Sequence, residues 1–134
     1  MSYVFKETQP CDRKLSASAC AFMIEEFHQS SDSARAVLGK IREAGFHYVD
    51  ISFRETPGGE TPFRPTLGPS DLQGLKVGCV ALRLDGFRDT PNFSAYMERA
   101  RREPIEQKIR EIGALGASAV YSEFPISVHA MGTR

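Results

Sequence analysis

The segment from Phe46 to Glu55 alternates between apolar and polar side chains, and this pattern limits the folds open to the chain. Side chains alternate across a β-strand, so such a segment has one apolar and one polar face. The two sets are Val49, Ile51 and Phe53 against Tyr48, Asp50, Ser52 and Arg54. Because antiparallel sheets commonly bury one face and expose the other, we expect helices on a single face of such a sheet.

Other segments also have the character of strands. Leu75 to about Phe87 is more continuously apolar, which predicts a central strand. A last strand is predicted to begin near Ala117 and to run past Pro125, which places it at an edge or a bulge because proline cannot donate to the ladder. Residues 2–7 are a further candidate strand.

Helical periodicity occurs in four places. From Ser16 onward, apolar residues recur with spacings of three and four, and the same pattern follows from Ser31 until Gly45 stops it. Two more helices are predicted, one from about Pro91 to Arg102 and one from Pro104 to about Leu115, because Pro104 should break a continuous helix.

This order predicts an α+β fold with a small antiparallel sheet of three or four strands and helices packed on one face. If residues 2–7 form a strand, the order matches the split β-α-β arrangement of ferredoxin-like domains; otherwise a three-stranded layer remains. The 134 residues are the usual length of one domain, so we expect residues 1–134 to form a single domain.

Charge and hydropathy narrow the classes of partner. The chain has 17 Lys and Arg against 17 Asp and Glu, without the basic excess of most nucleic-acid-binding proteins, so we expect no nucleic-acid partner. The chain has no apolar run of about 20 residues, and Lys6 interrupts its N-terminus, so neither a membrane span nor a secretory signal is predicted. We therefore expect a cytoplasmic protein.

The segment 56–74 joins two predicted strands and contains four prolines and four glycines. Its length of about nineteen residues far exceeds an ordinary hairpin loop, and loops this long are often functional. Phe63 and Leu67 are apolar anchors that should pack either on the body of the domain or on a partner, and Arg64 lies between them. The segment is thus either a loop folded over its own sheet edge or a binding loop.

The polar face of the sheet is the second candidate surface. Two tyrosines and two arginines are expected there, Tyr48, Arg54, Arg83 and Tyr121. Tyrosine and arginine are favoured in protein interfaces, although a solvated face with cross-strand ion pairs has the same composition.

Signatures of catalysis, cofactor binding and metal binding are missing from the sequence. It contains no phosphate-binding glycine motif, no nucleophile elbow and no histidine pair with metal-ligand spacing, so we expect neither cofactor nor metal. His28 is predicted to be a surface group that compensates a helix dipole. His129 is the histidine best suited to acid/base chemistry, because Glu123 and Tyr121 should share its face.

Two functional hypotheses follow. The first is a non-enzymatic interaction protein of the inhibitor, immunity or adaptor type, monomeric or homodimeric, that docks on a larger protein through 56–74 and the polar sheet face. The second is a small-molecule-binding protein or enzyme with a site between that face and the loop. His129 and Glu123 would then act as acid and base, and Arg54 and Arg83 would hold an anionic group.

Overall fold

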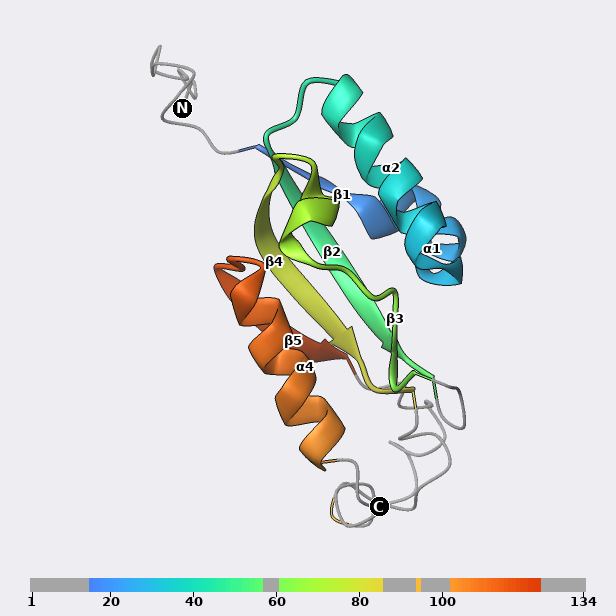
Figure 1. Ribbon diagram of the computed structural model, residues 1–134, viewed down its shortest axis with the longest axis vertical. Coiled ribbons are helices and arrows are strands. Elements are labelled where there is room, and N and C mark those ends of the chain that lie inside the picture. Colours follow the sequence, from blue (N-terminus) through green and yellow to red (C-terminus); the bar gives the residue numbers. More distant parts are fainter. Residues whose placement is uncertain (1–14, 57–60, 86–93, 95–101, 124–134) are drawn as a thin grey trace, which may run out of the picture.

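The computed structural model describes residues 15–56, 61–85, 94 and 102–123 (Figure 1). The described chain is a mixture of strands and helices. In order they are β1 (Ser16–Ser18), α1 (Ala19–Gln29), α2 (Ser31–Glu43), β2 (Tyr48–Glu55), β3 (Phe63–Arg64), the 3₁₀ helix η2 (Pro69–Leu72), β4 (Lys76–Arg83), α4 (Arg102–Ala114) and β5 (Ala119–Glu123).

The main sheet is parallel, and the predicted antiparallel sheet is wrong. Its strands lie in the order β1-β2-β4-β5, and every neighbouring pair on this path is parallel. Among the described strands, only the two-residue β3 is antiparallel, pairing with the end of β2. The fold is therefore of the α/β kind. The segment 56–74 forms part of a crossover between two parallel strands, which must carry the chain back along the sheet and so needs more residues than a hairpin.

The alternation in β2 misled the prediction because its polar face is not uniformly solvated. Ser52 on this face is only 3% exposed, although it is polar. The end of α1 reaches this face, and the Nε2 atom of His28 lies 2.5 Å from the Oγ atom of Ser52. A polar position on a strand can thus be buried when a polar partner meets it.

The core lies against the opposite face of β2. Val49, Ile51 and Phe53 are at most 3% exposed and belong to one cluster with apolar residues of the helices and of β4. From α4, the Nζ atom of Lys108 lies 3.9 Å from the centre of the Phe53 ring. In Figure 1, α4 runs along the sheet on the side of β4 and β5, while α1 and α2 lie toward β1 and β2.

The helices follow local sequence signals, with two corrections. The predicted end of α2 is confirmed by Gly45, whose φ of 96° is readily available only to glycine. The helix predicted from Ser16 begins at Ala19, because Ser16–Ser18 pair with β2 as β1. Pro104 does not start α4 but is its third residue, a position whose amide has no partner within the helix, so proline is tolerated there.

The segment from Thr61 to Gly74 is fastened to its own chain. Phe63 and Leu67 are 4% and 7% exposed and belong to the core cluster. The Ser31 hydroxyl donates a hydrogen bond to the carbonyl of Thr66 (2.8 Å). In addition, Arg35 of α2 donates to the carboxylate of Asp71 (3.0 Å). This part of 56–74 therefore folds over its own sheet.

Several predicted features fall outside the described residues. These are the strand at 2–7, the helix from Pro91 up to residue 101 apart from residue 94, and the last predicted strand beyond Glu123. No helix within the described ranges has the length and apolar character needed to cross a bilayer.

Candidate functional site

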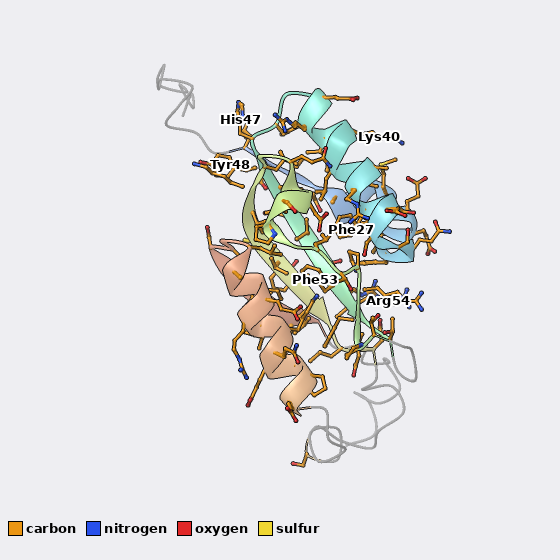
Figure 2. All side chains as sticks on the ribbon, viewed as in Figure 1. Phe27, Lys40, His47, Tyr48, Phe53 and Arg54 are labelled. Carbon is orange, nitrogen blue, oxygen red and sulfur yellow. The ribbon has the colours of Figure 1, made fainter. Side chains whose placement is uncertain are left out.

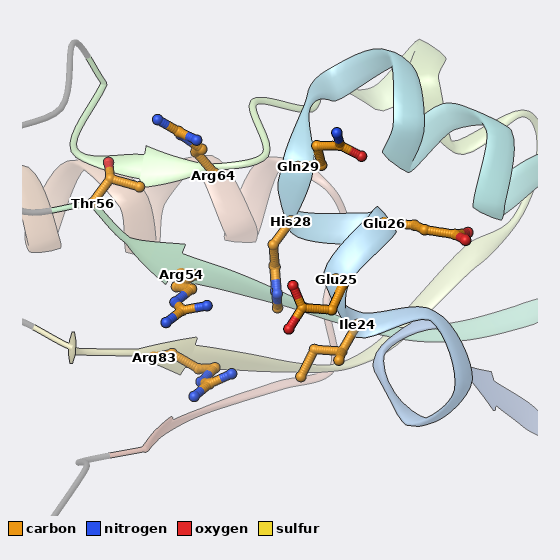
Figure 3. A pocket seen from close by; sticks show the side chains of 9 residues that line it. All are labelled: Ile24, Glu25, Glu26, His28, Gln29, Arg54, Thr56, Arg64 and Arg83. Carbon is orange, nitrogen blue, oxygen red and sulfur yellow. The ribbon is translucent and has the colours of Figure 1, made fainter.

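A pocket of about 510 Å³ opens where β2 and β4 end, close to the last turn of α1 (Figure 3). Arg54 and Arg83 are register partners on these neighbouring strands, so their side chains leave the sheet side by side. Arg64 of β3 lines the same pocket and is the partner of Arg54 across the antiparallel pair. Three strands thus each contribute one arginine to one hollow.

Arg54 is held by a buried carboxylate. Its Nε atom donates to the Oδ2 atom of Asp85 over 2.7 Å, and Asp85 is only 9% exposed. The two terminal nitrogens of Arg54 make no hydrogen bond to any residue that the structure describes. A guanidinium fixed through Nε keeps its two terminal nitrogens as a pair of donors. Their spacing matches two oxygens of a carboxylate or phosphate.

Arg83 interacts with Asp85 through charge rather than through a hydrogen bond. One of its terminal nitrogens lies 3.9 Å from the Oδ1 atom of Asp85, beyond hydrogen-bonding distance. That oxygen is buried and has no hydrogen-bond partner in the described part of the chain. Asp85 therefore fixes Arg54 directly and attracts Arg83, and the two guanidinium groups stay on the same side of the sheet.

His28 forms the inner wall of the pocket. It is 7% exposed, and the edge of its ring meets Ser52. Burial and the positive charge of Arg83 lower the pKa of His28, against a smaller opposing effect of its hydrogen bond to Ser52. The imidazole is therefore neutral near pH 7, and the cationic charge of the pocket comes from arginine.

Two glutamates of α1 also line the pocket, and they point in different directions. In Figure 3 the carboxylate of Glu25 points toward Arg54 and His28, whereas that of Glu26 points away from the arginines. Both residues are exposed. The pocket therefore carries an acidic group directly opposite its basic ones.

The structure gathers some of the predicted site residues and separates others. Arg54, Arg64 and Arg83 meet at the pocket. Tyr48 lies at the opposite end of β2 from Arg54, as Figure 2 shows, and lines a different hollow. Tyr121 of β5 is the register partner of Ala81 of β4 and is 53% exposed. Neither tyrosine lines the arginine pocket, although the register places Tyr121 on the same sheet face as Ser52 and Arg83.

Four further predictions concern 56–74 and the acid/base pair. Phe63 and Leu67 are core residues, so their apolar side chains hold the segment to the sheet. Glu123 is placed by its backbone next to Arg83, but its side chain and the whole of His129 lie outside the described structure. The acid/base roles of His129 and Glu123 stay predictions.

Sequence reasoning missed His28, Glu25 and Asp85 as site residues. His28 was expected at the surface, yet it is buried against Ser52. The available signal was the placement of Asp85 two residues after the end of an apolar strand, because ligand sites in parallel sheets gather at the carboxyl ends of strands. That signal has meaning only once the strands are known to be parallel.

Among residues 15–56, 61–85, 94 and 102–123, no group of three or more histidine, cysteine or acidic side chains could hold a metal ion. A scan against protein-family models finds no match, and searches of curated proteins and of solved structures find no similar protein.

Proposed function

We propose that this protein binds a small molecule through an anionic group held by Arg54 and Arg83. The observation that carries the proposal is that Arg54 is fixed at one nitrogen and open at the other two. Asp85 binds its Nε atom, while its terminal nitrogens line a pocket and make no hydrogen bond to described residues. This arrangement costs a ligand little ordering entropy, because the guanidinium is already positioned.

The location and size of the pocket support the same proposal. In parallel sheets, ligands bind beyond the carboxyl ends of the strands, and the pocket lies at the ends of β2 and β4. Its volume of about 510 Å³ is within the range of small-molecule sites. The charge on Arg64, which has no ion-pair partner among the described residues, adds to the attraction for an anion.

The proposal is tested by calorimetric titration with two simple probes, succinate and inorganic phosphate. Arg54→Lys keeps the positive charge but removes the two-pronged donor, so we expect carboxylate affinity to fall about tenfold or more. Arg64→Gln removes a charge from the rim, and a smaller loss, about two- to fivefold, is expected.

A matched control is Arg110→Gln, which removes the same charge from the exposed face of α4, where Arg110 pairs loosely with Glu106 at 3.9 Å. Its affinity should equal that of the unaltered protein. Equal losses in Arg110→Gln and Arg54→Lys would refute the proposal.

A protein-interaction role is the second candidate, and the observation that favours it is the exposure of β5. Val120 and Tyr121 are 42% and 53% exposed on the last strand of the sheet path. Exposed apolar and aromatic side chains on such a strand suit docking on a larger protein or on a second copy of the chain. Size-exclusion chromatography with light scattering measures the mass of the protein and of Val120→Ser. If the partner is a second copy, the mass of the unaltered protein should exceed 14.9 kDa, and the mass of Val120→Ser should be lower.

A cytoplasmic location, expected from the sequence, remains part of both proposals.

A further inference from the structure

The arginine pocket contains charges of both signs that face a common space. Glu25 on α1 directs its carboxylate toward Arg54 of β2 (Figure 3). Within the described residues, Glu25 forms neither a hydrogen bond nor an ion pair, and Arg54 uses only its Nε atom, for Asp85. Two unlike charged groups thus line one pocket without pairing with each other.

The carboxylate of Glu25 disfavours a ligand that is only anionic. Three arginines line the pocket, Arg54, Arg64 and Arg83. Against them stand Glu25 and the Asp85 that holds Arg54, while the carboxylate of Glu26 points away from the arginines. A phosphate dianion at Arg54 would face the carboxylate of Glu25, and like charges close together in a half-enclosed site repel.

A ligand with one negative and one positive group would satisfy both sides. Its carboxylate would take the donors of Arg54 and Arg83, and its ammonium group would take Glu25. The pocket also has an apolar wall at Ile24, which is 38% exposed. An aliphatic group of the ligand could cover this surface, and burying it would add to affinity.

We propose that the ligand of this pocket is a compact zwitterion of the α-amino-acid class, with its carboxylate at Arg54 and Arg83 and its ammonium group at Glu25. This inference rests on the proposed function and deepens it, since it adds the second charge of the ligand. Its recognition requires Glu25 and the arginines together, so neither group alone gives full affinity.

The test is a thermal-shift screen followed by calorimetry with the twenty standard amino acids and the carboxylic acids obtained by removing the α-amino group from each. At least one amino acid should bind, and its deaminated counterpart should bind at least tenfold more weakly. Equal binding of the two would overturn the zwitterion while leaving the anion site standing. Binding of neither set, nor of succinate or phosphate, would overturn both proposals.

Glu25→Gln should remove the preference for the amino acid over its deaminated counterpart. The affinity for the amino acid should fall about tenfold, and the affinity for its deaminated counterpart should stay the same or rise, because a repulsive charge is lost. Glu26→Gln is the control, since Glu26 lies on the same helix with its carboxylate pointing away from the arginines. If Glu25→Gln and Glu26→Gln have equal effects, Glu25 does not recognise an ammonium group and the inference fails.

Discussion

At the residue scale, Gly78 is required by a polar contact between β2 and β4. A Cβ atom added at Gly78 would lie 2.6 Å from the Oδ1 atom of Asp50, closer than real Cβ contacts come. That oxygen accepts hydrogen bonds from the hydroxyl of Ser16 (3.0 Å) and from the amide of Cys79 (2.8 Å), so it cannot move without loss. We therefore expect Gly78→Ala to lower the free energy of unfolding by about 1–3 kcal/mol.

Urea unfolding of Gly78→Ala measures this effect. The double variant Gly78→Ala with Asp50→Ser should cost less than the sum of the two single substitutions, because serine removes the colliding carboxylate. Strictly additive losses would show that the clash is not the cause.

The stability of the fold should depend on pH through His28. Its pKa is lowered in the folded protein by burial and by Arg83, with weaker effects of Arg54 and Asp85 that oppose each other. Below the ordinary histidine pKa of about 6.5, the unfolded chain therefore binds more protons than the folded one. The contribution of His28 to stability is complete above this value and is lost as the pH falls toward the lowered pKa.

We expect the free energy of unfolding to be smaller at pH 5.5 than at pH 8, and the difference to shrink in His28→Asn. Urea unfolding at the two pH values, for both proteins, is the measurement. The acidic side chains and the other histidines are common to both proteins and serve as the internal control. A pH dependence identical in the two proteins would contradict the assignment to His28.

At the scale of elements, α4 meets the sheet through a buried lysine. The Lys108 side chain is 7% exposed and pairs with Glu111 at 3.1 Å, while its ammonium group lies over the Phe53 ring. Burial lowers the pKa of Lys108, and the ion pair with Glu111 opposes this effect. The cost of desolvating the ammonium group therefore offsets much of what its contacts contribute.

Replacing Lys108 by Met keeps the bulk of the side chain over Phe53 and leaves Glu111 half-exposed to water. We expect Lys108→Met to unfold at the same temperature as the unaltered protein or at a higher one. Glu111→Gln instead removes the negative charge that compensates the buried ammonium group of Lys108. It should lower the free energy of unfolding by about 1 kcal/mol. Thermal unfolding of both variants decides this, and a clearly lower melting temperature for Lys108→Met would show that the charge stabilises the fold.

Most described helices and strands could be located from sequence, whereas the pairing of the strands could not. The glycine at the end of α2 and the alternation in β2 are local signals, and local signals place elements. Parallel pairing depends on long-range packing. The polar face of β2 looked solvated because nothing local shows that His28 buries Ser52.

At the scale of the whole molecule, the parallel sheet creates the candidate site. In an antiparallel arrangement, the ends of β2 and β4 would lie at opposite edges and Arg54 and Arg83 would be far apart. Parallel pairing makes them register partners, and Asp85, two residues after the end of β4, forms an ion pair with both. Sequence reasoning could name the two arginines but could not derive why they meet, since that follows from the topology.

The most direct test of the anion site is an NMR titration of the ¹⁵N-labelled protein with succinate. Amide shifts are predicted to concentrate in residues 52–56 and 82–85 and in the last turn of α1, with millimolar or tighter binding, and to vanish in Arg54→Lys. Shifts centred on Tyr48 and its neighbouring hollow, or shifts unchanged in Arg54→Lys, would contradict the placement of the site.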